Sequence, residues 1–217
     1  MIKWSFSGYK DYETCPKQYY EVRIAKNFTK PDTPQTLYGK EVHKACEDYV
    51  RDGTPLPKNY GRFQKVLDAL KGIPGTKYLE YQMALRLDKS PCEFDSPDYW
   101  VRGIADYLNV DDDVAHVADY KTGKARYPEP KQLKLMALMT FAHFPEVKSV
   151  NGALIFLLHD VFIDEYYTRE QIPELWSAFS GTLKRIETSH ESDVWNPNPS
   201  GLCGWCPVET CRFHRRR

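Results

Sequence analysis

Two aspartates and a lysine lie in a stretch that otherwise has the apolar pattern of buried strands. In residues 103–124, GIADYLNVDDDVAHVADYKTGK, Asp106 lies in one apolar run, and Asp119 and Lys121 lie in a second. If the chain turns at residues 112–113 as a two-residue hairpin loop, Asp106 lies opposite Asp119, with Cβ atoms about 4.5–5.5 Å apart. Two carboxylates at this separation repel each other unless a cation lies between them.

This pattern favours a divalent-metal site that cleaves phosphodiesters. Carboxylate oxygens prefer Mg²⁺ or Mn²⁺, and a site with few carboxylates leaves coordination positions for water and phosphate. The strand period of two places Lys121 on the face of Asp119, where its ammonium would position water or offset developing charge. A three-residue loop would instead place Asp106 opposite Ala118 and the two acids on different faces. The alternative interpretation is a solvent-facing hairpin edge, because acids often lie on the outward faces of antiparallel sheets.

The elements that would position these residues follow an α/β order. Apolar periodicity predicts helices over 35–50 and 60–70, the second stopped by Gly72-Ile73-Pro74-Gly75. It predicts strands over 77–88, with Leu79, Tyr81, Met83, Leu85 and Leu87 on one buried face, and over 99–110, 114–121, 152–158 and 161–167. A helix with Pro130 in its first turn would cross between 114–121 and 152–158, which makes that pair parallel. A capping box at 168–171 would open a last helix to about residue 189.

Composition bounds the protein class. The chain has 217 residues, 41% hydrophobic and 28% charged, which suits one domain with a small appendage. Lys plus Arg equals Asp plus Glu at 30 each, so only a local basic surface would indicate a nucleic-acid partner. The sequence has no apolar run that would span a bilayer and no signal-peptide core at residues 1–5, so we expect a cytoplasmic protein without membrane contact.

Three of the six cysteines crowd the end of the chain as C-x2-C-x4-C: Cys203, Cys206 and Cys211. Such spacing predicts a metal site, in a loop-built tail because the Pro-rich residues 196–201 cannot continue the last helix. The fourth ligand is either His214, which completes a compact zinc knuckle, or Cys15, which gives a four-cysteine site suited to a [4Fe–4S] cluster. Cys46 and Cys92 are expected to be a buried thiol and a loop thiol.

These residues together resemble the PD-(D/E)XK nuclease superfamily and, within it, the RecB-type group that includes CRISPR-adaptation and phage-type exonucleases. Gly103-Ile104-Ala105-Asp106 is similar to the group's G-x-x-D motif, and Asp119-Tyr120-Lys121-Thr122-Gly123 to its D-Y-K-T-G motif. Gly39-Lys40-Glu41-Val42-His43 matches the helical G-x-x-x-H element. Gln132 and Leu133 match the start of Q-x-x-x-Y, but Met136 stands where the family has tyrosine.

The resemblance implies the site. His43, Asp106 and Asp119 would hold Mg²⁺ or Mn²⁺, and Tyr120 would add its backbone carbonyl. Lys121 would assist the water, and Gln132 would belong to the catalytic set, in a first helical turn that favours phosphate.

The resemblance also bears on the cysteines. Ser5-Phe6-Ser7-Gly8-Tyr9 and Cys15-Pro16-Lys17-Gln18-Tyr19-Tyr20 are similar to the N-terminal motif of iron–sulfur members, which pair one early cysteine with three late ones. A [4Fe–4S] cluster on Cys15, Cys203, Cys206 and Cys211 is therefore favoured over zinc.

The expected fold is α/β, a restriction-endonuclease-like mixed central sheet flanked by helices, with a C-terminal cysteine-rich metal-bound tail. A single nuclease domain over 1–217 would comprise an N-terminal segment 1–34 with the first cluster cysteine, a nuclease core 35–190 and a tail 191–217.

The expected function is a divalent-metal-dependent deoxyribonuclease. It would be an exonuclease on DNA ends or single-stranded DNA, in recombination, repair, phage DNA metabolism or CRISPR spacer acquisition, in a bacterial, archaeal or phage-infected host cell. A homo-oligomer or a recombination, helicase or integrase partner is compatible with the sequence. The alternatives are a non-catalytic nucleic-acid-binding module with a zinc knuckle and a nuclease-like subunit of a larger complex. Basic residues that could contact phosphates lie after the second acidic strand and at the chain end: Lys124, Arg126, Lys131, Lys134, Arg212, Arg215, Arg216 and Arg217.

Overall fold

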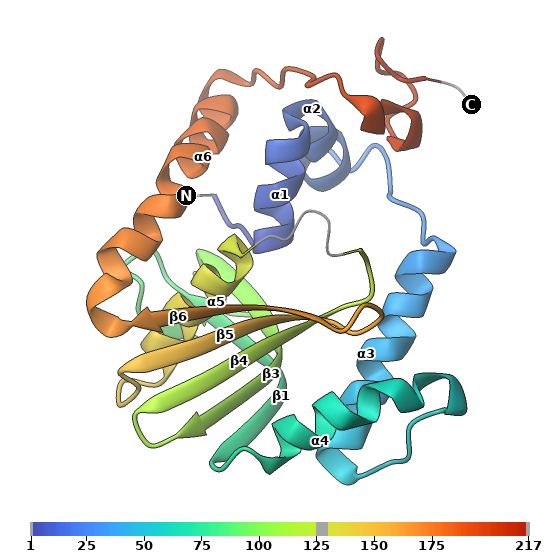
Figure 1. The fold of residues 1–217 in the computed structure, drawn as a ribbon. Helices are drawn as coiled ribbons and strands as arrows, with labels where there is room; N and C mark the ends of the chain where they lie inside the picture. Colours follow the sequence, from blue (N-terminus) through green and yellow to red (C-terminus); the bar gives the residue numbers. More distant parts are fainter. Residues whose placement is uncertain (1, 125–129, 216–217) are drawn as a thin grey trace. The chain divides into compact units, whose positions relative to one another are not determined.

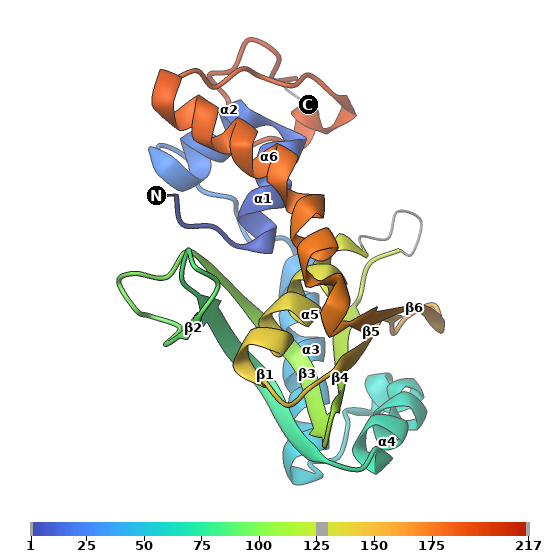
Figure 2. The same cartoon turned by 90° about the vertical axis from the view of Figure 1, so that its left-hand side faces the viewer.

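The apolar runs in the middle of the chain form a six-stranded mixed sheet in the computed structural model, which describes residues 2–124 and 130–215 (Figure 1). The strand order is β2-β1-β3-β4-β5-β6. The strands are β1 (Thr76–Leu85), β2 (Pro91–Cys92), β3 (Val101–Asp111), β4 (Val114–Lys121), β5 (Ser149–Phe156) and β6 (Val161–Thr168). Figure 2 shows the short β2 beside β1 at one edge of the sheet. The predicted mixed α/β class is confirmed.

The β3–β4 hairpin has the predicted two-residue loop. Asp111 pairs with Val114, and the same register continues to the pair of Tyr107 and Ala118. The next position in this register would set Asp106 opposite Asp119, but the pairing ends one residue before it. Instead, Asp106 Oδ2 accepts a hydrogen bond from the backbone N–H of Tyr120 at 2.7 Å. The two acids therefore lie where the strands begin to part.

The predicted parallel pair is also confirmed. Helix α5 (Lys131–His143) connects β4 to β5, and Val114 to Lys121 pair in parallel with Ser149 to Phe156. Pro130 caps α5 one residue before its first turn rather than lying inside it. The helix is almost entirely buried from Leu133 to Phe141, as expected for a crossover packed on a sheet.

The alternation predicted for residues 77–88 is interrupted at Glu80. Glu80 has φ +50, and it is the one residue missing from an otherwise continuous β1–β3 register, opposite Asp106. Gly103 lies against Met136 and Met139 of α5, whereas Tyr107, four residues on, donates to the carbonyl of Leu70. In a regular strand, residues 103 and 107 would lie on the same face, because they are an even number of residues apart. Here they face different helices, so the two faces of β3 exchange near Asp106.

The end of β1 corrects a second detail of that prediction. The strand stops at Leu85, and Leu87 lies beyond it with 58% of its surface exposed.

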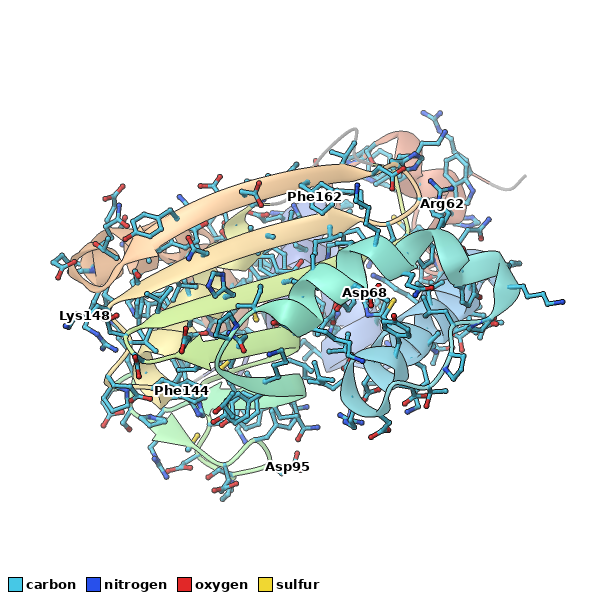
Figure 3. The ribbon with its side chains drawn as sticks, turned by 60° about the horizontal axis from the view of Figure 1, so that its bottom comes forward. Arg62, Asp68, Asp95, Phe144, Lys148 and Phe162 are labelled. Carbon is cyan, nitrogen blue, oxygen red and sulfur yellow. The ribbon has the colours of Figure 1, made fainter. Side chains whose placement is uncertain are left out.

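Two further helices pack on the sheet. They are α3 (Pro34–Asp52) and α4 (Gln64–Gly72), the latter preceded by a 3-10 helix (Lys58–Phe63). Their apolar faces form one core cluster with strand residues: Val42, Cys46, Val50, Tyr60, Phe63, Leu67, Tyr107, Ala118, Tyr120, Ile155 and Leu157. Arg62 fixes the 3-10 helix to the β5–β6 connection by donating to the Leu158 carbonyl at 2.9 Å. Arg62 and Phe162 of β6, both labelled in Figure 3, line the same pocket. Cys46 is the predicted buried thiol, and burial raises its pKa to about 12. Cys92, expected in a loop, is a partly buried residue of β2.

The chain forms two compact units. The core unit comprises Thr33–Trp176, and the terminal unit comprises Met1–Asp32 with Ser177–Arg217. The division into segments 1–34, 35–190 and 191–217 stays a prediction.

The terminal unit contains α1 (Phe6–Thr14), α2 (Pro16–Tyr19), a π-helical turn (Tyr20–Ile24), most of α6 (Ile172–Ser192) and a 3-10 turn (Gly201–Trp205). The predicted capping box opens a 3-10 turn (Arg169–Gln171) that leads directly into α6, and in it the Thr168 N–H donates to Gln171 Oε1 at 2.8 Å.

The two ends of the chain meet inside the terminal unit. Tyr12 donates to the Arg185 carbonyl at 2.9 Å and lies 2.8 Å from Ser189 Oγ, and Figure 2 shows α6 beside α1. Trp195 packs among Tyr12, Tyr19 and Tyr20. Among the described residues, no helix is both long and apolar enough to cross a bilayer.

Candidate active site and cysteine pocket

A histidine and two carboxylates from three different elements converge in the core unit. His43 comes from α3, Glu80 from β1 and Asp106 from β3, and one donor atom of each lies within 4.8 Å of the others. Among the described residues, this is the group of three whose side chains could share a metal ion. The break in the β1–β3 pairing turns Glu80 and Asp106 out of the regular strand positions, which lets both reach His43 of the helix.

Asp119 is held in a second set of contacts beside this group. Its Oδ1 accepts a hydrogen bond from Gln132 Nε2 at 2.5 Å, and its Oδ2 lies 2.5 Å from Lys121 Nζ. Lys121 Nζ also donates to Gln132 Oε1 at 2.9 Å. The amide of Gln132 therefore bridges the carboxylate and the ammonium and fixes both.

His43 uses both ring nitrogens. Nδ1 lies 3.4 Å from Asp106 Oδ2, and Nε2 lies 2.9 Å from the backbone carbonyl of Tyr120. Burial by itself lowers the pKa of His43, but the hydrogen bond to Asp106 and the charges of Asp106, Asp119 and Glu80 outweigh burial and raise it. Both partners of the ring are acceptors, so each ring nitrogen has an acceptor within reach.

Burial and the charge of Asp106 raise the pKa values of Asp119 and Glu80. Burial first and the charge of Asp106 second raise the pKa of Asp119 to about 6, against the lowering effect of Lys121. The same two causes raise the pKa of Glu80 to about 7, while His43 lowers it. Each carboxyl resists ionisation because it is desolvated beside another carboxyl, and a bound cation would remove that resistance.

The donor set fits a hard divalent cation. One imidazole and carboxylate oxygens are ligands that Mn²⁺ accepts, and Mg²⁺ favours the carboxylates. Asp119 Oδ2 is buried, and the ammonium of Lys121 lies 2.5 Å from it. A carboxylate oxygen has more than one lone pair, so this contact leaves acceptor capacity for a bound cation.

Local sequence positions His43. A capping box between Thr33 and Thr36, with Pro34 in the first turn, starts α3 two turns before the histidine. A Cβ atom at Gly39 would lie 3.3 Å from Thr122 Oγ1. The neighbour of Gly39 in the structure is therefore Thr122, just after the acidic strand.

The predicted site residues are thus close together, but not as one group. His43, Asp106 and the carbonyl of Tyr120 lie on one side, and Asp119, Lys121 and Gln132 lie on the other. Their catalytic and metal-binding roles stay predictions. Met136, which stands in place of the family tyrosine, is 3% exposed and packs against Gly103, so it fills core space.

Glu80 was missed by the sequence analysis. It lies in a strand whose apolar neighbours predict ordinary alternation, and nothing local marks its register against Asp106. The only hint in the sequence was an acid at the centre of the strand that precedes the acidic hairpin. This hint points to the site only when the β1–β3 pairing is known, because that pairing places Glu80 opposite Asp106.

The four predicted cluster cysteines line one pocket in the terminal unit. Cys15, Cys203, Cys206 and Cys211 share it with His214, which the zinc alternative uses. Cys15 Sγ accepts the backbone N–H of Asn198 at 3.4 Å, and Cys203 Sγ accepts that of Ser200 at 3.3 Å. Burial raises the pKa of Cys206, and the other three sulfurs raise it further. The fold therefore brings the early cysteine to the three late ones.

The basic residues proposed for phosphate contacts are only partly described. Lys124 is exposed, and Lys131 and Lys134 are partly exposed on α5. Arg212 lies over the ring of Phe213, 4.7 Å from its centroid. Arg126, Arg216 and Arg217 lie outside the described residues.

The sequence matches a known family, and the fold is similar to a solved structure. A family model described as the PD-(D/E)XK nuclease superfamily matches residues 60–211. Among solved structures, a candidate exonuclease from Eubacterium rectale has a TM-score of 0.54 and 14% identity, covering 99% of this chain and 88% of that one. The structure of SSO0001 has a TM-score of 0.49 and 12% identity, with the same coverage of both chains. No curated protein matches the sequence significantly. The family match contains Asp106, Asp119 and Lys121, while His43 and Cys15 precede it.

Proposed function

Because this chain belongs to the PD-(D/E)XK nuclease superfamily of metal-dependent nucleases, we propose that it hydrolyses phosphodiester bonds in DNA, at DNA ends or in single strands. The observation that carries the proposal is the buried Asp119, held by Lys121 and Gln132 beside the His43–Glu80–Asp106 group. Exonuclease action agrees with the description of the Eubacterium rectale neighbour. The RecB-type subgroup and a role in recombination, repair, phage or CRISPR processes stay implications of the motif resemblance.

In this proposal, the chain's own residues divide the work. His43, Glu80, Asp106 and Asp119 would hold Mg²⁺ or Mn²⁺, with the Tyr120 carbonyl nearby. The bound ion would polarise a phosphoryl oxygen and lower the pKa of a bound water. Lys121 is about one-third exposed, so its ammonium can face the attacking water or the phosphate while Asp119 and Gln132 hold it. Gln132 is a positioning residue, because it acts through Lys121 and Asp119.

The test is hydrolysis of end-labelled single-stranded DNA, duplex DNA and RNA with Mn²⁺, using wild type, Asp119→Ala and Asp119→Asn. We expect wild type to shorten DNA and the hydrolysis rate of both variants to be lower by about 100-fold or more. Asp95→Ala removes an exposed acid of the core unit and should act as wild type. If wild type binds DNA but leaves every substrate intact, the protein is a non-catalytic binding module and the nuclease proposal is wrong. Cleavage of RNA alone would contradict the choice of DNA.

For the terminal unit, we propose a structural [4Fe–4S] cluster on Cys15, Cys203, Cys206 and Cys211. The four cysteines line one pocket, which agrees with a site built from four thiolates. The backbone N–H groups that point at Cys15 and Cys203 support thiolates, as in iron–sulfur sites.

A further inference from the structure

The sheet ends at β6, and within the described part of the chain no strand pairs with the outer edge of β6. The eight residues of β6 pair with β5 in one uninterrupted register, and Figure 3 shows β6 as the outermost strand, with Phe162 labelled. An outer strand presents backbone N–H and C=O groups with which a further extended chain can pair. Lysine, proline and bulges are common protections of such an edge, and residues 161–168 contain none of the three.

The hydrogen bonds at the end of β6 identify the backbone groups that face outward. The Arg169 N–H donates to the Lys148 carbonyl at 2.9 Å, which continues the β5–β6 register by one pair. Because the bonding direction alternates along an antiparallel strand, the odd-numbered residues of β6 bond β5 and the even-numbered residues face away from it. The Thr168 N–H agrees with this alternation, since it donates to Gln171 Oε1 and not to β5.

Three outward-facing residues occupy the middle of the edge: Phe162, Asp164 and Tyr166. Their outward N–H and C=O groups form no backbone hydrogen bond to another described residue. Phe162 is paired with Ile155 of the core cluster, so its side chain lies on the α4 side of the sheet, and strand parity places Asp164 and Tyr166 on the same face. Phe162 is 50% exposed and Tyr166 60%, so each ring keeps half or more of its surface for a partner.

Two hollows lie beside these side chains on the same face. One, of about 360 Å³, adjoins Phe162 and is lined by Val66 of α4. The other, of about 300 Å³, adjoins Asp164 and Tyr166 and is lined by Leu70 near the end of α4. A strand added to β6 would direct alternate side chains to this face, where the hollows can receive them.

Asp164 determines which kind of strand fits the edge. Two copies of β6 that pair antiparallel through all three outward residues would place Asp164 opposite the same residue of the second copy, with Cβ atoms about 4.5–5.5 Å apart. Asp164 is exposed, and the neighbouring Glu165 adds a second negative charge. Like charges directly opposite are destabilising, so the edge disfavours self-pairing, whereas a lysine or arginine at the opposing position would be attracted.

We propose that β6 is a docking edge for an extended segment of another protein, which adds antiparallel to the sheet with a lysine or arginine opposite Asp164. The partner residues two positions to either side are apolar, because they lie opposite Phe162 and Tyr166 and beside the two hollows. The outward backbone groups supply affinity, and the alternate apolar, basic and apolar side chains supply specificity. The proposal is independent of the nuclease function, since none of the residues assigned to the candidate active site belongs to β6.

The first experiment tests the charge preference by amide NMR of the isotope-labelled full chain. The probes are the acetylated and amidated peptide Thr-Val-Thr-Lys-Thr-Val-Thr and the same peptide with glutamate at its centre. The lysine peptide should shift the amide resonances of Phe162, Asp164 and Tyr166 and bind about tenfold more tightly than the glutamate peptide. Asp164→Lys should reverse this preference. Shifts confined to other surfaces, no binding at millimolar peptide, or equal affinity of the two peptides would overturn the proposal.

The second experiment tests the backbone pairing. Tyr166→Pro removes an outward N–H but no hydrogen bond between β5 and β6, and proline is tolerated at such edge positions. Tyr166→Thr is the matched control, because it also removes the ring but keeps the N–H. The lysine peptide should bind Tyr166→Pro about fivefold or more weakly than it binds Tyr166→Thr, and circular dichroism verifies that both variants fold. Equal affinity for the two variants would contradict strand addition.

A modified peptide repeats this test without altering the protein. N-methylation of the central lysine blocks the N–H that faces β6, whereas N-methylation of the threonine next to it blocks an N–H that faces away. The first modification should abolish most of the binding, and the second should change it less. The same loss from both modifications would contradict the proposed register.

Sedimentation velocity separates a foreign segment from a second copy of this chain. Wild type and Tyr166→Pro should have the same association state, because the acids keep β6 from pairing with itself. Association of wild type that Tyr166→Pro abolishes would assign the edge to a second copy and overturn the proposal.

Discussion

At the scale of single residues, Asp119 combines burial, a lysine partner and a neighbouring acid. Its pKa of about 6 means that, without a cation, the folded protein holds the Asp119 proton more tightly than the unfolded chain does. The unfolded carboxyl ionises near its ordinary value, about 3.9. Ionisation therefore favours unfolding as the pH rises between these two values.

Asp119→Asn should remove this pH-dependent cost. Below about pH 4 the carboxyl is protonated in both states and costs nothing, and above about pH 6 the cost is complete, at most about 3 kcal/mol. In EDTA, the free energy of unfolding of the variant relative to wild type should thus rise between about pH 4 and about pH 7.5. Urea unfolding at both pH values measures this, because effects of the substitution that do not depend on pH cancel.

Added Mn²⁺ supplies the control for that measurement. At about pH 7.5, saturating Mn²⁺ should stabilise wild type more than Asp119→Asn, because the ion binds the folded state through the ionised acids. A difference between the two proteins that stays constant across pH, with equal stabilisation by Mn²⁺, would show that Asp119 does not titrate as described.

At the scale of elements, the site depends on how α4 leads into β1. Gly75, just before β1, has φ +107, and a Cβ atom there would clash with the Val110 carbonyl oxygen of β3. Buried Asn109 of β3 fixes the same turn by donating to the Pro74 carbonyl at 2.7 Å. These contacts set the β1–β3 register, and that register places Glu80 opposite Asp106.

Gly75→Ala should therefore destabilise the core unit by about 3 kcal/mol or more, from the left-handed φ and the backbone clash together. Gly72→Ala is the matched control. Gly72 is the last residue of α4, and a Cβ atom there would meet no atom of the described residues within 4 Å, so alanine should stabilise by roughly 0.5–1 kcal/mol. Denaturant unfolding measures both, and equal stability of the two variants would contradict this account of the turn.

At the scale of the whole molecule, the two ends of the chain form one unit around the cysteine pocket. Contacts of Tyr12 with Arg185 and Ser189, and of Asn198 with Thr14 and Cys15, join segments far apart in the sequence. A cluster that spans Cys15 and the three late cysteines would restrict the unfolded chain strongly, because it closes a loop around the core unit's sequence.

Cys15→Ser and His214→Ala should therefore behave differently. After anaerobic purification, we expect wild type and His214→Ala to contain iron and absorb visible light, and Cys15→Ser to lose most of both and melt at a lower temperature. Metal analysis, visible absorbance and calorimetry measure this. Zinc in wild type, kept by Cys15→Ser and lost by His214→Ala, would establish the zinc knuckle instead.

The sequence by itself determined the features that depend on short-range pattern. The sequence placed the acidic hairpin and narrowed its loop to two or three residues, and the two-residue loop of the structure sets the register from Asp111–Val114 to Tyr107–Ala118, because a hairpin's loop length sets every later pair. The order of β4, α5 and β5 fixed a parallel pair, because a helix that connects two neighbouring strands returns the chain to the edge where the first strand began. The first helices, α1 and α2, were missed, although the buried Tyr9, Tyr12 and Tyr19 mark one side of them.

Only the tertiary structure decided which distant residues share a site. Glu80 reaches His43 because the β1–β3 pairing breaks at Asp106, and Gln132 meets Asp119 because α5 packs back on the sheet. Such contacts depend on strand register between segments joined by long connections and on the direction of side chains at a strand break. Neither is encoded in local periodicity, because both result from packing the whole core.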